Sequence, residues 1–161
     1  MGVIIRTEYD APCGKLYLAA TDDALCHACW HPLDIGEEGI NDVLYETRRQ
    51  LDEYFSGARR AFDIPLCHAG YTAFQQKVWH VLKGIPYGTT ISYKAEAEML
   101  GNINAIRAVA QANALNPLCI FVPCHRVIGS NGRLTGYSGG LDKKRFLLEI
   151  ESARLSQILS F

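Results

Sequence analysis

The feature of this sequence that most restricts its fold is the apolar stretch 120–128, which is interrupted by a proline, a cysteine, a histidine and an arginine. Residues 120–122 are of the kind that favours β-strands. Pro123 has no backbone N–H and its φ is fixed, so a strand must stop or lie at a sheet edge there. We therefore expect Cys124, the next residue, at the end of a strand and held by a stiff segment.

Cys124 is a candidate nucleophile because His125 and Arg126 follow it directly. The thiolate is the reactive form of cysteine, and cationic or hydrogen-bonding neighbours lower the pKa of a thiol. Most cysteines are buried packing residues, and for an isolated cysteine that structural interpretation would be preferred. The surrounding sequence favours the nucleophile here.

The residues around Cys124 belong to an ordered set of motifs. Pro-Cys-His-Arg-Val occupies 123–127, with Asn-Pro at 116–117 and Gly-Tyr-Ser-Gly-Gly-Leu at 136–141. Upstream stand Phe-Gln-Gln-Lys-Val-Trp at 74–79, Ile-Pro-Tyr-Gly at 85–88, Ile-Ser-Tyr at 91–93 and Arg-Ala-Val at 107–109. In this order, over roughly residues 72–151, the chain resembles the O6-alkylguanine-DNA alkyltransferases, also called methylated-DNA–protein-cysteine methyltransferases.

The resemblance implies DNA repair by direct alkyl transfer. Cys124 would accept a methyl or larger alkyl group from O6-alkylguanine, and from O4-alkylthymine, in double-stranded DNA after the damaged base has been flipped out of the stack. The thioether formed is not a leaving group under cellular conditions, so each molecule would act once. The expected protein is a suicide methyltransferase that works as a monomer, with no cofactor and no metal.

The resemblance also implies catalytic roles. His125 would draw the proton from Cys124 through a bound water, with Glu151 orienting the imidazole. A relay is expected because neighbouring side chains on a strand point to opposite faces. Asn116 would hold the site backbone by its amide, and Tyr93 would donate a proton or hydrogen bond to the departing guanine. Structural alternatives are a helix cap for Asn116 and a half-buried packing role for Tyr93.

A second implied set of residues binds the substrate. Arg107 would fill the space that the flipped base leaves in the duplex, and the carbonyl groups of Cys124 and Val127 would read the guanine amino group. The implied set is Arg107, Tyr137, Ser138, Val127, Ser92 and Gly139. Phosphate contacts are expected from basic residues, which could equally be solvated charges: Lys94, Arg133, Lys143, Lys144 and Arg145.

Charge is distributed unevenly along the 161 residues. The net charge is −1, but residues 1–69 hold six basic and twelve acidic residues, whereas residues 70–161 hold ten basic and five acidic ones. Phosphate binding needs a local cationic face, so the second half is the candidate nucleic-acid surface. No apolar run approaches the roughly eighteen residues of a membrane span, and the N-terminus lacks a signal-peptide pattern. We expect no membrane partner and a cytoplasmic location.

Six cysteines are too few for a disulfide framework at this length. A zinc site in the first half is an alternative, because Cys-x-x-Cys with nearby histidines is ligand chemistry. Its candidate ligands are Cys26, His27, Cys29, His31, Cys67 and His68.

Residues 1–69 predict an N-terminal α/β support domain, a small antiparallel sheet plus a helix, ribonuclease H-like in the family that the chain resembles. Strands are expected over 4–20, with a turn at 10–14, and over 24–30. Apolar periodicity predicts a helix over 41–55 that closes near Gly57. A further short strand over 61–66 and a linker over 67–70 complete this half.

Residues 70–161 predict a mostly α-helical DNA-binding and alkyl-acceptor domain of helix-turn-helix, winged-helix-like type. Helices are expected over 72–83, from 90 or 92 to 100, and from 104 or 105 to 115, the last two joined by a Gly-Asn turn. The last helix is rich in alanine, which suits close packing against another helix as well as approach to a DNA groove. After Glu151 we expect a solvated helical tail.

Three other functions fit parts of the sequence. A DNA-binding module that does not repair its target would lack the acceptor cysteine, which is present here. A transcription factor using the helix-turn-helix would carry a regulatory domain, and no segment of the chain suggests one. A cysteine hydrolase would need Cys124 and His125 in direct contact and an oxyanion hole.

Overall fold

The structure of the protein is a computed structural model that describes residues 2–159, with side chains to residue 152. It divides into two compact units, residues 1–69 and 70–161. Within the described residues, none of the helices has the length and apolar character needed to cross a membrane.

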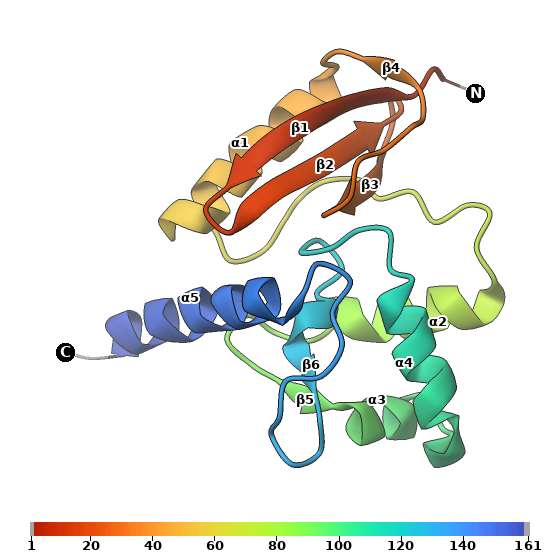
Figure 1. Cartoon of the computed structure of the whole chain (residues 1–161), viewed down its shortest axis with the longest axis vertical. Coiled ribbons are helices and arrows are strands. Elements are labelled where there is room, and N and C mark those ends of the chain that lie inside the picture. Colours follow the sequence, from red (N-terminus) through yellow and green to blue (C-terminus); the bar gives the residue numbers. More distant parts are fainter. Residues whose placement is uncertain (1, 160–161) are drawn as a thin grey trace. The chain divides into compact units, whose positions relative to one another are not determined.

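The first unit is built on a four-stranded sheet (Figure 1). Its strands are β1 (Ile5–Ala11), β2 (Gly14–Ala20), β3 (Leu25–Cys29) and β4 (Glu37–Glu38), in the order β3-β2-β1-β4. The first three pair antiparallel, as predicted, and β4 pairs parallel with β1, which the sequence did not suggest. Leu16 and Leu18 are fully buried on one face of β2, and Lys15 and Tyr17 on the other face are more exposed. Ala19 and Ala20 at the end of the strand are both fully buried.

Helix α1 (Asp42–Ser56) covers one face of this sheet. It begins where the Asn41 side chain accepts a hydrogen bond from the Leu44 amide, and it ends at Gly57, whose φ of 89° is left-handed. Leu44, Leu51 and Tyr54 are fully buried. The predicted α/β arrangement of the first half is therefore confirmed.

The strand predicted over 61–66 is wrong in extent. Only Leu66 forms a bridge, to Leu25, through bonds from the Leu25 amide to the Pro65 carbonyl and from the Cys67 amide to the Leu25 carbonyl. Pro65 has no N–H to donate, so the ladder stops.

The second unit is mainly helical. Helix α2 (Ala73–Lys83) begins with a reciprocal cap between Thr72 and Gln75. Helix α3 (Tyr93–Met99), the 3-10 turn η1 (Ile103–Ala105) and helix α4 (Ile106–Ala114) form the predicted helix-turn-helix. The Trp79 indole N–H donates to the Ala112 carbonyl at 3.0 Å and ties α2 to α4. Helix α5 (Leu141–Leu159) completes the unit, and the predicted solvation of the tail lies outside the described side chains.

Two short parallel strands, β5 (Ile91–Ser92) and β6 (Val127–Ile128), hold the start of α3 beside the segment that follows the cysteine. The strand predicted before Pro123 is absent. Residues 118–123 form tight turns, with Ile120 at φ 77° and the Val122 amide bonded to the Leu118 carbonyl. The apolar run before Pro123 is buried throughout. Such a run has no periodicity that distinguishes a strand from a buried turn, so the prediction of a strand was wrong.

Candidate active site

Cys124 opens the 3-10 turn η2 (Cys124–Arg126), which the bond from the Arg126 amide to the Pro123 carbonyl closes at 3.0 Å. The cysteine therefore precedes a strand, β6, instead of ending one. Its side chain is only 6% exposed, yet it contributes to the wall of a pocket of about 580 Å³. Successive side chains on a 3-10 turn also point in different directions. Cys124 and His125 are thus still expected to point apart, because of the turn and not because of a strand.

Asn116 pins this turn by three hydrogen bonds. Its Nδ2 donates to the Val122 carbonyl at 2.8 Å and to Sγ of Cys124 at 3.3 Å, and its Oδ1 accepts from the Leu118 amide. The side chain is buried, so each of these bonds forms out of competition with water.

The pKa of the Cys124 thiol is lowered. The largest cause is a hydrogen bond from the Cys119 thiol. Burial opposes it, and the Asn116 amide and the positive charge of Lys144 lower the pKa further. The same contact raises the pKa of Cys119, so of the two thiols Cys124 is the one that ionises. These neighbours favour the nucleophilic form of Cys124.

Behind the cysteine, His125 and Arg126 both bind Glu151. Nε2 of His125 lies 2.8 Å from one carboxylate oxygen, and the Arg126 guanidinium donates two bonds of 2.9 Å. Burial raises the pKa of Glu151, but the bonds from His125 and Arg126 outweigh it and the net shift is downward. Glu151 is thus a carboxylate, and Nε2 of His125 must be the donor.

Nδ1 of His125 is buried and has no hydrogen-bond partner among the described residues. Burial lowers the pKa of His125, opposed by Glu151. The neutral ring that donates from Nε2 carries its lone pair on Nδ1, so this atom is available to accept a proton. The bonds of Arg126 to Glu151 were not predicted, although the position of Arg126 directly after His125 in a buried motif was a signal for them.

Tyr93 and Lys144 converge on the loop after β6. The Tyr93 hydroxyl donates to the Thr135 carbonyl at 3.2 Å, and burial raises the pKa of the phenol. Nζ of Lys144 donates to the Thr135 and Gly136 carbonyls at 2.6 and 3.2 Å and lies 5.7 Å from the centre of the Tyr93 ring. These bonds hold the loop against the start of α3.

The prediction that Lys144 contacts phosphate is wrong, because its side chain is fully buried. Lys144, Leu147 and Glu151 lie at helical spacing and form the buried stripe of α5. Since Glu151 was expected to face the site, its spacing from Lys144 was a signal that the lysine faces inward too. Lys94, Arg133 and Arg145 are exposed and Lys143 is half-buried.

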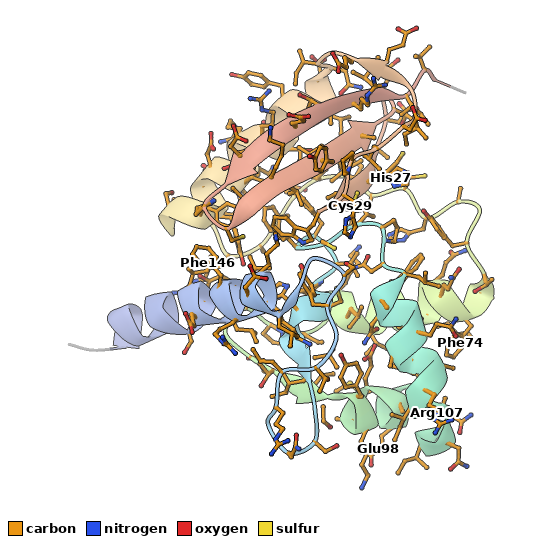
Figure 2. All side chains as sticks on the ribbon, viewed as in Figure 1. His27, Cys29, Phe74, Glu98, Arg107 and Phe146 are labelled. Carbon is orange, nitrogen blue, oxygen red and sulfur yellow. The ribbon has the colours of Figure 1, made fainter. Side chains whose placement is uncertain are left out.

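The pocket brings together six of the predicted residues, from α3, η2, α4 and the loop after β6: Tyr93, Lys94, Arg107, Cys124, Tyr137 and Ser138. Arg107, labelled in Figure 2, extends from the first turn of α4 and is exposed. Ala110 and Ala114 of the same helix contribute to the pocket, whereas Ala112 is buried in the unit. Alanines thus line the pocket on one face of α4 and pack within the unit on the opposite face, and approach of this helix to a DNA groove stays a prediction.

Other predicted site residues lie beside the pocket. The Ser92 hydroxyl caps α3 by accepting from the Ala95 amide at 2.9 Å, and Val127 is fully buried in β6. Gly139 follows Ser138 in the loop and is half-buried. Pocket residues that sequence reasoning missed are Ile106, Asn113, Ser130 and Thr135.

No three His, Cys, Asp or Glu side chains among the described residues are grouped so as to hold a metal ion. His27 and Cys29, labelled in Figure 2, lie on β3, and the Cys29 thiol bonds to the His31 carbonyl. No three of the residues considered as zinc ligands are therefore grouped as a metal site in the part of the chain that the structure describes.

The arrangement around the thiol does not fit a cysteine hydrolase. No hydrogen bond joins His125 to Cys124 among the described residues: Nε2 of His125 binds Glu151, Nδ1 has no partner, and Sγ of Cys124 accepts from Asn116. A nucleophilic cysteine at a pocket walled by both helices of a helix-turn-helix instead defines a DNA-binding protein with a covalent acceptor.

Comparison with known proteins gives the particular family. Residues 73–153 match the DNA-binding domain of 6-O-methylguanine DNA methyltransferase, and residues 4–67 match its ribonuclease-like domain. The chain belongs to the 6-O-methylguanine DNA methyltransferase family, which confirms the resemblance and the fold class inferred from the sequence.

Relatives are similar over nearly their whole length. The methylated-DNA–protein-cysteine methyltransferase of Methanosarcina acetivorans is 42% identical over 151 residues, which cover 90% of this chain and 96% of the relative. The constitutive enzyme of Bacillus subtilis is 44% identical, covering 90% and 93%. The crystal structure of Mycobacterium tuberculosis OGT in complex with DNA superposes with a TM-score of 0.86 at 41% identity, covering 93% and 94%.

Proposed function

We propose that this protein repairs alkylated DNA by moving the alkyl group from O6 of guanine to Sγ of its own Cys124. The observation that carries the proposal is the position of Cys124, a thiol with a lowered pKa in the wall of a pocket formed by both helices of the helix-turn-helix. Residues 70–161 form the DNA-binding and acceptor domain, and residues 1–69 form a support domain.

The reaction begins with ionisation of the thiol. Nδ1 of His125 takes the proton through a water molecule, and the carboxylate of Glu151 stabilises the imidazolium. Arg126 keeps Glu151 charged and in place through its two hydrogen bonds. The Cys119 thiol, Asn116 and Lys144 stabilise the thiolate on its other sides.

The transfer step is an in-line displacement at the alkyl carbon. A C–S bond forms to Cys124 while the bond from that carbon to O6 breaks, and its electron pair leaves with guanine. Charge developing on the base requires a donor, and the Tyr93 hydroxyl is the donor at the pocket. It must exchange its bond to the Thr135 carbonyl for one to the substrate. The thioether does not break again, so one protein molecule repairs one lesion.

Base flipping brings the lesion to the thiol, because O6 of guanine is not within reach inside the duplex. Arg107, exposed at the first turn of α4, enters the duplex in place of the base. Ser138 and Tyr137 hydrogen-bond the flipped base, and the carbonyl groups of Cys124 and Val127 read its amino group. O4-alkylthymine is the expected second substrate, since it presents the same kind of alkylated oxygen.

The test is stoichiometric. The protein is incubated with a duplex containing one O6-methylguanine, and the tryptic peptides are analysed by mass spectrometry. We expect one added methyl group, on the Cys124 peptide only, and none in Cys124→Ser; Cys119→Ser, which leaves the acceptor in place, should still be methylated. Methylation at another residue, or more than one lesion repaired per molecule, would overturn the proposal.

A further inference from the structure

Glu96 of α3 and Asn113 of α4 form a buried polar contact between the two helices of the helix-turn-helix. Glu96 is fully buried and Asn113 is 6% exposed. Nδ2 of Asn113 donates to Oε1 of Glu96 at 2.7 Å. Neither residue belongs to the proton relay or was implied by the sequence motifs.

Each of these side chains has one further oxygen without a hydrogen-bond partner among the described residues, Oε2 of Glu96 and Oδ1 of Asn113. If Glu96 were ionised, both atoms would be acceptors and could not bind each other. A buried acceptor without a donor costs free energy, and a buried unpaired carboxylate costs more.

Among the described residues, no cation lies close enough to Glu96 to offset a charge on it. The charged residues on α3 itself and on the two helices packed against it are all exposed, and none forms an ion pair with Glu96: Lys94, Glu98, Lys77, His80, Lys83 and Arg107. Of the other elements, η1, β5 and β6 also pack on α3 and hold no charged side chain. Lys144 of α5 is a buried cation 5.7 Å from the centre of the Tyr93 ring, but it donates to the Thr135 and Gly136 carbonyls and forms no ion pair with Glu96. The pKa of Tyr93 is raised chiefly by burial, and a charge on Cys124 or on Glu96 would raise it further.

We propose that Glu96 is held as a carboxylic acid whose Oε2–H donates to Oδ1 of Asn113, closing a cyclic acid–amide pair that positions Asn113 in the pocket. One proton then gives both Oε2 of Glu96 and Oδ1 of Asn113 a hydrogen bond. The two bonds together fix the orientation of the Asn113 amide. Burial independently raises the pKa of Glu96 from 4.5 to about 7, opposed by the Asn113 bond.

The consequence for function rests on the proposed alkyl transfer. The pair joins the helix that begins with Tyr93 to the helix that carries Arg107, and Asn113 lines the same pocket as Cys124. Glu96 is thus a positioning residue. Loss of its proton would break the bond from Oε2 to Oδ1 of Asn113, leave two buried acceptors facing each other and loosen α3 against α4.

The decisive variant is Glu96→Gln, because a glutamine amide can donate to Oδ1 of Asn113 and accept from its Nδ2 at every pH. Glu98→Gln is the matched control: it removes the same charge from the exposed side of α3, where Figure 2 labels it. Transfer from O6-methylguanine duplex is measured against pH for the three proteins. Effects of Cys124 ionisation are common to all and cancel in the ratios.

We expect the rate of Glu96→Gln relative to wild type to be near one below the midpoint of Glu96 and to rise to about tenfold one pH unit above it, because about one acid in ten is then protonated. Glu98→Gln should follow wild type throughout. A ratio that does not change with pH would overturn the positioning role.

The protonation itself is tested without DNA. The side-chain carboxyl carbon of Glu96, assigned by its disappearance in Glu96→Gln, is followed by NMR against pH, and a midpoint near 7 is expected. A midpoint at or below 4.5 would overturn the acid–amide pair. If Glu96→Gln does not fold, the carboxyl is assigned by triple-resonance NMR of the wild-type protein. If the protein does not transfer alkyl groups, the rates cannot be measured, but the NMR titration still tests the acid–amide pair.

Discussion

His125 and Glu151 are joined by a hydrogen bond of 2.8 Å from Nε2 to a carboxylate oxygen, and both side chains are almost fully buried. This bond decides the tautomer of the imidazole and leaves Nδ1 as the atom that can accept a proton. Arg126 binds the same carboxylate. Glu151 therefore both orients the His125 ring and compensates the charge of the buried Arg126 guanidinium.

Glu151→Gln should therefore lower both stability and activity. It removes the charge that stabilises a protonated His125 and leaves the buried Arg126 guanidinium without its counter-ion. We expect a loss of about 3–5 kcal/mol in the free energy of unfolding, measured by urea denaturation, with slower methyl transfer. Glu149→Gln, an exposed position on the same helix, is the control; equal losses in both variants would contradict a specific role for Glu151.

Asn116→Ala should destabilise the turn that holds Cys124. It removes the donor to Sγ of Cys124 and one of two donors to the Val122 carbonyl, and it leaves the Leu118 amide without its partner. We expect about 1–3 kcal/mol of lost stability and a higher pKa for the Cys124 thiol. The pH dependence of iodoacetamide labelling at Cys124 measures that pKa, and an unchanged midpoint beside Asn104→Ala, exposed on η1, would argue against the contact.

Lys144 should make stability rise with pH in the alkaline range. Burial lowers its pKa from 10.5 to about 8 in the folded protein. Between these values the unfolded chain binds more protons than the folded one, so the free energy of unfolding increases as pH rises from about 8 to 10.5. Thermal unfolding across this window should show the increase in the wild type and in Lys143→Met, and not in Lys144→Met.

Lys144→Met should also raise the pKa of the Cys124 thiol, because its positive charge helps to lower that pKa. Labelling of Cys124 by iodoacetamide would then require a higher pH. The same midpoint in Lys144→Met and Lys143→Met would show that the charge of Lys144 does not reach the thiol.

Arg107→Ala should separate base flipping from chemistry. Flipping costs a few kcal/mol of unstacking, and the arginine offsets that cost only in a duplex. We expect transfer from duplex DNA to fall by about tenfold or more, while transfer from free O6-methylguanine is nearly unchanged. Lys77→Ala, exposed on α2, should leave both rates near those of the wild type; similar losses on both substrates would count against Arg107 as the residue that replaces the base.

Much of the fold could be predicted from local signals. The ends of α1 coincide with a capping asparagine and a left-handed glycine, and α2 begins at the predicted Thr72. Those signals act over a few residues and depend little on the rest of the chain. The strand expected before Pro123 failed because a fully buried apolar run has no periodicity that separates a strand from a turn.

The sequence by itself determined the family and the helix-turn-helix, because the motifs over residues 74–141 have residue types with few other uses together. It also predicted Cys124 as the acceptor, with His125 and Glu151 as its relay, and these roles stay predictions. Only the tertiary structure decided that Lys144 points inward, that Arg126 shares Glu151 with His125, and that Glu96 meets Asn113. Each of these contacts joins residues from different elements. Whether a polar side chain is buried depends on what packs over it, and no local pattern contains that information.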